Sequence, residues 1–123
     1  LCSFVVLITA CQSSGAADQS DALAVLSTQL AAEKSKPEGS QSAAKCPAAL
    51  IEFKGLSRLE IHKSLGSPDT FKLKTVSPPK ISEATYFIAP KSLHGIRRGG
   101  QPEITFHFND SEKVVGAECA LSK

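Results

Sequence analysis

The four cysteines of this 123-residue chain are the residues whose type and spacing most clearly indicate chemistry. The first eleven residues, LCSFVVLITAC, form an apolar run that ends at Cys11 and carries the small residues Thr9 and Ala10 just before it. Small side chains before a cysteine let a signal peptidase approach the backbone, as at the end of a bacterial lipoprotein signal peptide. We therefore expect residues 1–10 to be a signal peptide and Cys11 to become the lipidated first residue of the mature chain.

Lipidation of Cys11 would hold the protein at a membrane. The following residue is Gln12 and not the aspartate associated with inner-membrane retention, which favours an anchor in the outer membrane that faces the periplasm. The alternative is an ordinary buried cysteine at the end of a first strand over residues 4–9. The polar and small residues that come next, QSSGAADQS, are typical of a tether and favour the lipid.

Cys46 and Cys119 remain once Cys2 leaves with the signal peptide and Cys11 carries the lipid. Because the periplasm is oxidising, we expect these two thiols to form one disulfide, whereas the same spacing in a cytosolic protein would more often mean inert thiols. Closing a loop of about 74 residues would stabilise the fold by roughly 4 kcal/mol on the chain-entropy account of disulfides.

A cationic stretch lies between two predicted strands, in the segment PKSLHGIRRGGQP over residues 90–102. It predicts a site for phosphate, lipid A or an acidic protein surface, bound by charge-assisted hydrogen bonds from Lys91, His94, Arg97 and Arg98. The alternative is a solvated hairpin tip with ordinary charges.

No pattern in the sequence indicates catalysis or a metal site. The histidines lack H-x-x-x-H spacing, since they stand at His62, His94 and His107, and no G-x-S-x-G motif of a nucleophilic serine occurs. A net charge of +2 and an aromatic content of 6% do not indicate a nucleic-acid binder. We expect neither an enzyme nor a cofactor.

Residues 11–45 are expected to tether the lipid to a folded domain. Leu23, Leu26 and Leu30 predict a short amphipathic helix over residues 20–35, within an alanine-rich stretch. That helix either rests on a partner or the membrane, or frays within the linker, because a stripe of three leucines is marginal without a packing partner. Residues 36–45, KPEGSQSAAK, predict a disordered spacer, so we place the domain boundary near Cys46.

The expected domain, residues 46–123, begins with two short helices. The first runs from Pro47 through Phe53, and the second begins at a capping box of Ser57 and Glu60. The residue patterns then predict strands over residues 71–75, 83–89, 103–108 and 114–121. The first of these strands has one solvent-exposed face, and the last has a possible bulge at Gly116. This order predicts an α+β fold, in which two helices pack on a three- to four-stranded antiparallel sheet.

The segment GLSRLEIHKSLGSPD, residues 55–69, resembles the BamE family, also called SmpA/OmlA, whose helix pair ends in Leu-Gly-x-Pro. Residues 65–68, Leu-Gly-Ser-Pro, match that ending, and the resemblance covers roughly residues 50–120. It implies an outer-membrane lipoprotein with two helices on a three-stranded sheet, resembling a β-lactamase-inhibitor repeat, that helps the β-barrel assembly machinery.

These observations lead to two functional expectations. The first is a lipid-anchored, non-enzymatic periplasmic module that binds an envelope protein or assists envelope assembly. The alternative is a periplasmic inhibitor or ligand-binding module that uses the sheet face or the basic loop. Neither expectation involves a nucleic acid.

Overall fold

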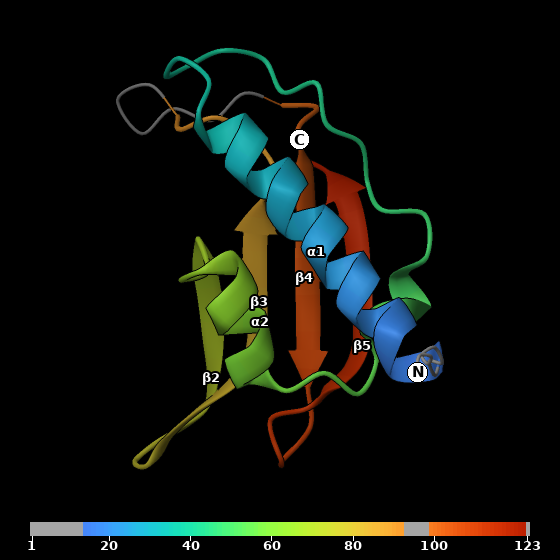
Figure 1. The fold of residues 1–123 in the computed structure, drawn as a ribbon. Coiled ribbons are helices and arrows are strands. Elements are labelled where there is room, and N and C mark those ends of the chain that lie inside the picture. The colour runs from blue at the N-terminus through green and yellow to red at the C-terminus, as the bar shows by residue number, and fades with distance from the viewer. Residues whose placement is uncertain (1–13, 93–98, 123) are drawn as a thin grey trace, which may run out of the picture.

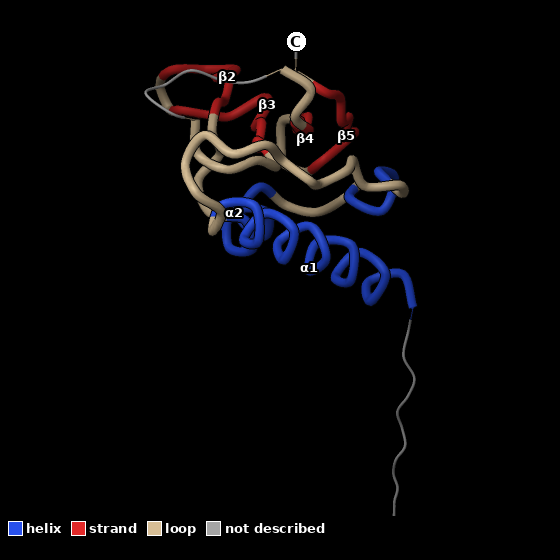
Figure 2. Tube along the Cα trace, turned by 90° about the horizontal axis from the view of Figure 1, so that it is seen from above, coloured by secondary structure: helices blue, strands red, loops and turns tan. Residues whose placement is uncertain are grey.

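The computed structural model describes residues 14–92 and 99–122, with side chains from residue 21 onward. Its helical elements are α1 (Ser14–Lys34), the 3-10 turn η2 (Leu50–Phe53) and α2 (Arg58–Leu65). Its strands are β2 (Thr70–Val76), β3 (Pro79–Phe87), β4 (Pro102–Phe108) and β5 (Val114–Leu121), which pair antiparallel in that order. Figures 1 and 2 show the helices on one face of this sheet. The predicted α+β fold is confirmed, with four strands.

Helix α1 is longer than predicted and belongs to the core. It begins at Ser14, so most of the polar stretch expected to be a tether is helical. Its three leucines are buried, with Leu23 6%, Leu26 1% and Leu30 7% exposed, and they join one hydrophobic cluster with the sheet. The fold therefore continues N-terminally past the boundary expected near Cys46, because the sheet supplies the packing partner that a three-leucine stripe needs.

The segment over residues 36–45, predicted to be a disordered spacer, is held against the domain by hydrogen bonds. Gly39 N donates to the Lys91 carbonyl at 2.8 Å, and Ser42 Oγ donates to the Ile88 carbonyl at 2.8 Å. Glu33 Oε1, on α1, accepts from Ala43 N at 3.3 Å. These bonds satisfy backbone groups that a free linker would leave to water, so the segment is an ordered connection between α1 and η2.

Helix α2 begins at the predicted capping box. Ser57 Oγ accepts from Glu60 N at 3.1 Å, and Glu60 Oε1 accepts from Ser57 N at 2.9 Å, which satisfies two donors that the first helical turn leaves free. Gly66 ends the helix with φ at 81°, a left-handed conformation that favours glycine. The helix predicted before it, from Pro47 through Phe53, is reduced to the single 3-10 turn η2, which buries Phe53.

The core lies between the helical layer and the inner face of the central strands. Phe106 on β4 is fully buried and makes edge-to-face contacts with Phe53, at 5.4 Å between ring centroids, and with Tyr86, at 6.0 Å. Such pairs add about 0.5–1.5 kcal/mol to the burial of their area. Tyr86 Oη donates to the Gly66 carbonyl at 2.8 Å, so β3 and the end of α2 are joined through the core.

Strand β2 is found where predicted, but it buries neither face. All seven of its residues are exposed, including Phe71 at 55% and Leu73 at 43%. The strand has a neighbour on one side only, and two register shifts interrupt its pairing with β3. Figure 2 shows β2 farther from the helices than β4, so the helical layer does not cover it. On β5 the predicted irregularity is present, because Val115 is left out of the pairing next to Gly116.

Candidate functional site

Cys46 and Cys119 form the predicted disulfide, with Cα atoms 5.7 Å apart. Cys46 ends the ordered connection that follows α1, and Cys119 lies on β5 and packs against the core. The bridge therefore ties the chain that leaves α1 to an edge strand of the sheet.

The other predicted site residues are only partly within the described chain. Cys11 lies outside it, as do His94, Arg97 and Arg98 of the basic loop. Lys91 is described, and with Ser92 it lines a cavity of about 260 Å³ that the sequence did not predict. Lys91 and Ser92, at the start of the basic loop, therefore form part of the wall of this cavity.

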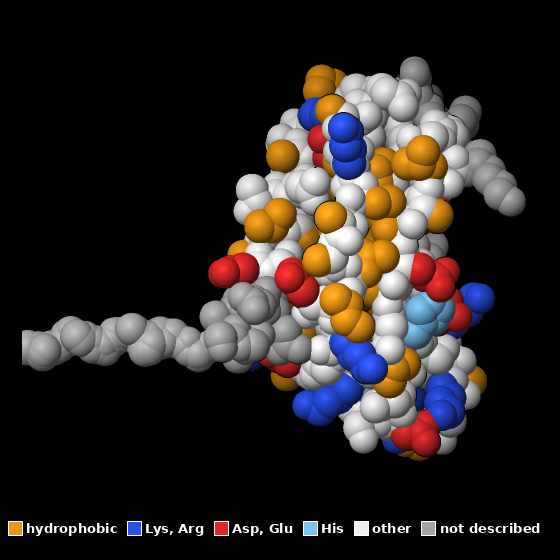
Figure 3. All heavy atoms as spheres, turned by 90° about the vertical axis from the view of Figure 1, so that its right-hand side faces the viewer, with side chains coloured by type: hydrophobic (Ala, Val, Ile, Leu, Met, Phe, Trp, Pro, Cys, Tyr) orange, Lys and Arg blue, Asp and Glu red, His pale blue; other side chains and the backbone are white. Residues whose placement is uncertain are grey.

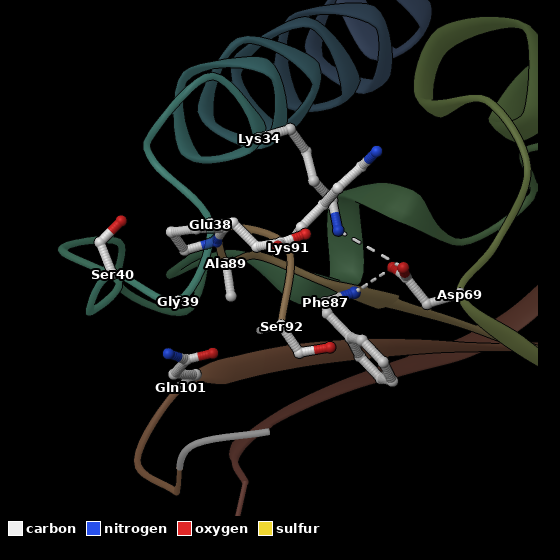
Figure 4. Close-up of a pocket in the computed structure, with 11 residues that line it drawn as sticks. Lys34, Glu38, Gly39, Ser40, Asp69, Phe87, Ala89, Lys91, Ser92 and Gln101 are labelled. Atoms are coloured by element: carbon white, nitrogen blue, oxygen red, sulfur yellow. Dashed lines mark hydrogen bonds and ion pairs between the residues drawn. The ribbon is translucent and has the colours of Figure 1, made fainter. Parts of the chain in front are cut away.

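We call this cavity the polar cavity. Its walls come from the end of α1 and the following turn, from the residue before β2, from the end of β3 and from the residue before β4. Two amines, two carboxylates, two hydroxyls and one carboxamide line it, from Lys34, Lys91, Glu38, Asp69, Ser40, Ser92 and Gln101. Figure 4 shows these side chains around the opening. The balanced charges suit an uncharged ligand with both donors and acceptors better than a multiply charged anion.

Asp69 is the most firmly held side chain of the polar cavity. Its Oδ2 accepts from Phe87 N at 2.8 Å, its backbone N donates to the Thr85 carbonyl at 2.9 Å, and its Oδ1 lies 3.4 Å from Lys34 Nζ (Figure 4). Both side chains of this ion pair are about one-third exposed, so the pair adds little stability. The ion pair instead holds one carboxylate and one amine in place at the mouth of the polar cavity.

Gln101 contributes a buried carboxamide to the same cavity. The residue is 5% exposed, and its backbone N and O both bond to Ser122, at 3.1 and 2.7 Å. No hydrogen bond joins its side-chain amide to another residue of the described chain. A buried amide without a partner costs about 1–3 kcal/mol, so this group favours a water or a ligand in the cavity.

Sequence patterns indicate these residues only weakly. Asp69 follows Pro68 at the end of a helix, which marks a turn but not a site. Lys34 and Gln101 are distant from it in sequence and meet it only because α1 packs over the sheet.

The face of the sheet turned away from the helices carries a row of charges across all four strands. Lys72 Nζ lies 3.7 Å from Glu83 Oε1, and Glu83 Oε2 lies 3.8 Å from His107 Nδ1. His107 Nε2 lies 3.1 Å from Glu118 Oε2. This row is a solvated face with paired charges, and its groups do not converge on a cavity.

Glu33 and Glu112, which lie outside the cavity, are stabilised in their ionised form. Burial raises the pKa of Glu33, but hydrogen bonds from Lys36, Ser42 and Ala43 outweigh it, so the pKa lies below its ordinary value. Hydrogen bonding from Arg58 lowers the pKa of Glu112, whose Oε2 is 2.9 Å from Arg58 Nε. Both groups fasten loops to helices.

Within the described residues, no three histidine, cysteine or acidic side chains gather closely enough to hold a metal ion. No helix in that part of the chain is both long and apolar enough to cross a bilayer. Comparison with known protein families, curated proteins and solved structures finds no match to this chain.

Proposed function

We propose that this chain is a lipid-anchored binding domain of the bacterial envelope, which acts by contact with a partner protein and not by catalysis. The observation that carries the proposal is the Cys46–Cys119 bridge, because structural disulfides persist in oxidising compartments such as the periplasm. The lipoprotein-like sequence that ends at Cys11 and the resemblance of residues 55–69 to BamE lipoproteins support the same compartment.

The position of α1 adds a geometric constraint to this proposal. The helix begins at Ser14, three residues after Cys11, so an extended link would span about 10 Å at most. A lipid on Cys11 would then hold the domain close to the bilayer. Its partner would be another protein at the outer-membrane surface.

Fractionation of a Cys11→Ser variant tests the anchor. The wild-type precursor, expressed in a Gram-negative host, should sediment with the outer membrane, and the variant should move to the soluble periplasmic fraction. Cys2→Ser is the matched control, because Cys2 is expected to leave with the signal peptide, and it should fractionate like the wild type. Sedimentation of Cys11→Ser with the membrane would contradict the proposal.

A pull-down tests the binding surface. Replacing Arg97 and Arg98 together with alanine should weaken capture of an envelope protein, and Lys63→Ala, which alters an exposed residue of α2, should not. Equal capture by both variants would exclude the basic loop as the contact.

A second function, binding of a small polar ligand, is favoured by the buried carboxamide of Gln101. N-acetylglucosamine is a suitable probe, because its amide and hydroxyls match the donors and acceptors of the polar cavity. In an NMR titration, shifts should be confined to the cavity residues and disappear in Gln101→Leu. No shift in the wild type would exclude this class of ligand and leave the protein partner unaffected.

A further inference from the structure

The described chain leaves one edge of the sheet open, and this edge is formed by β2. Strand β3 pairs with β2 on one side, and within the described residues no other backbone–backbone hydrogen bond reaches residues 70–76. Figure 1 shows β2 at the margin of the sheet. The outward N–H and C=O groups of an edge strand match those of another extended chain, so this edge is a template for one added strand.

The opposite edge, formed by β5, is occupied by the chain itself. Gly55 N donates to the Val114 carbonyl and Val114 N donates to the Leu56 carbonyl, both at 2.8 Å. Near the other end of the strand, Cys119 is bonded to Cys46. Figure 3 shows hydrophobic side chains gathered in a band on the side of the molecule that carries β5 and η2. The edge that can accept an added strand is therefore β2.

The side chains of β2 indicate what an added strand must carry on the face turned toward the helices. Phe71 pairs with Ala84, which belongs to the core, and Leu73 pairs with Ile81, which packs against the core. Because residues paired across antiparallel strands share a face, Phe71 and Leu73 lie on the core side. They are nevertheless 55% and 43% exposed. Apolar residues at alternate positions of an added strand would cover them.

The charges of β2 favour acidic residues at the other positions of the added strand. The strand carries Lys72 and Lys74 and no acidic residue. Lys72 Nζ lies 3.7 Å from Glu83 Oε1, and Lys74 is paired with Asp110. The Lys72 side chain is still 74% exposed, so it can also donate to a group on the open side. Opposite charges that face each other across strands stabilise the pairing.

A second copy of this chain fits the open edge poorly. Antiparallel pairing of two copies keeps Leu73 opposite an apolar residue in two registers, one centred on Lys72 and one centred on Leu73. The first register sets Lys72 against itself, and the second sets Lys72 against Lys74. Like charges directly opposite each other destabilise a pair of strands. Lysines and bulges on an edge strand guard against such self-pairing, and the lysines at the same time favour an acidic partner.

We propose that β2 binds an extended segment of a partner protein in which acidic residues alternate with apolar ones, and that this segment joins the sheet as a further strand. The inference rests on the proposed contact with a partner protein and names the surface and the form of that contact. The main-chain hydrogen bonds supply affinity. The exposed faces of Phe71 and Leu73 supply apolar contact, and Lys72 determines the sign of the charge that is accepted.

Titration with a model peptide tests the proposal. The probe is a peptide of about eight residues that alternates valine with glutamate, long enough for one ordinary strand. It is added to the soluble Cys11→Ser protein and followed by NMR. The signals of β2 should shift, and amides of β2 should exchange with deuterium roughly tenfold more slowly at saturation. The matched control peptide, with lysine in place of glutamate, should bind at least roughly tenfold more weakly, because it replaces attraction by repulsion.

Two variants and one control locate the contact. Lys72→Gln should weaken binding of the glutamate peptide about fivefold, which is the most that one cross-strand charge pair supplies. Phe71→Thr should also weaken it, since the peptide then loses apolar contact on the core side. Both side chains are largely exposed, so the fold should be retained. Lys63→Gln, which removes the same charge from an exposed residue of α2, should leave binding unchanged.

Each contrary outcome overturns the proposal. Failure of the glutamate peptide to bind, or shifts without slower exchange in β2, would mean that no strand is added. Equal binding of the glutamate and lysine peptides would mean that the lysines do not select the partner. A dimer joined through β2 would mean that a second copy occupies the edge. None of these results bears on the lipid anchor, which fractionation of the Cys11→Ser variant tests separately.

Discussion

Replacement of Leu26 by alanine tests whether α1 is part of the fold or a segment of the tether. Leu26 is 1% exposed and lies in the hydrophobic cluster between α1 and the sheet. Truncating a buried leucine costs about 2–5 kcal/mol, the larger values arising where the surroundings cannot relax. Because a surface hollow between α1 and residues 45–52 borders this residue, we expect partial relaxation and a loss of about 3 kcal/mol. A domain of this size has a free energy of unfolding of about 5–15 kcal/mol.

The neighbouring residue gives a matched control. Val25 is on the same helix and 63% exposed, so Val25→Ala should change the free energy of unfolding by no more than about 0.5 kcal/mol. Both variants are made in the soluble Cys11→Ser background and unfolded in urea, followed by circular dichroism. Equal stabilities would refute the packing of α1 on the sheet. A lower slope of free energy against urea for Leu26→Ala would show that part of the fold had already opened.

Three further predictions use the same unfolding assay. The double variant of Cys46→Ala and Cys119→Ala should lose about 4 kcal/mol, because the bridge closes a loop of 73 residues, and a loss below about 1 kcal/mol would contradict the entropic account. Ser57→Ala should cost about 1 kcal/mol through its capping box, whereas exposed Ser64→Ala should be neutral, and equal effects would argue against the cap. Glu33→Gln should cost about 1.5 kcal/mol at neutral pH. Since the pKa of Glu33 is lowered in the fold, this difference should be full above pH 4.5 and vanish as the pH falls through the folded pKa, and a difference that is constant with pH would refute the assignment.

Local signals in the sequence predicted local structure well. The spacing of Ser57 and Glu60 predicted the start of α2, and both hydrogen bonds of the capping box are present. The residue pattern over 103–108 predicted strand β4, and Ile104 and Phe106, which share one face of it, are fully buried. Counting cysteines predicted the disulfide. The capping box and the strand depend on residues that are neighbours in sequence. The disulfide depends on a residue type with few alternative partners in the chain.

Features that depend on distant packing were missed. The leucine stripe of α1 looked marginal because its partner, the sheet, is contributed by residues after position 80. Phe71 and Leu73 alternate like a half-buried strand, yet both are exposed, because alternation does not reveal that β2 is an edge strand away from the helices. The polar cavity collects Lys34, Asp69 and Gln101 from three separate parts of the chain, and no spacing rule links them.

The Cys46–Cys119 bridge also determines how the protein responds to a protease. A single cut anywhere between the two cysteines, for example by trypsin after Lys91, leaves both fragments covalently joined. The β3–β4 pairing would still hold the fragments in register. Nicked protein should therefore migrate as one species on a non-reducing gel and separate into two only after reduction. The protein can therefore be cut within the loop that the disulfide closes and still keep its fold.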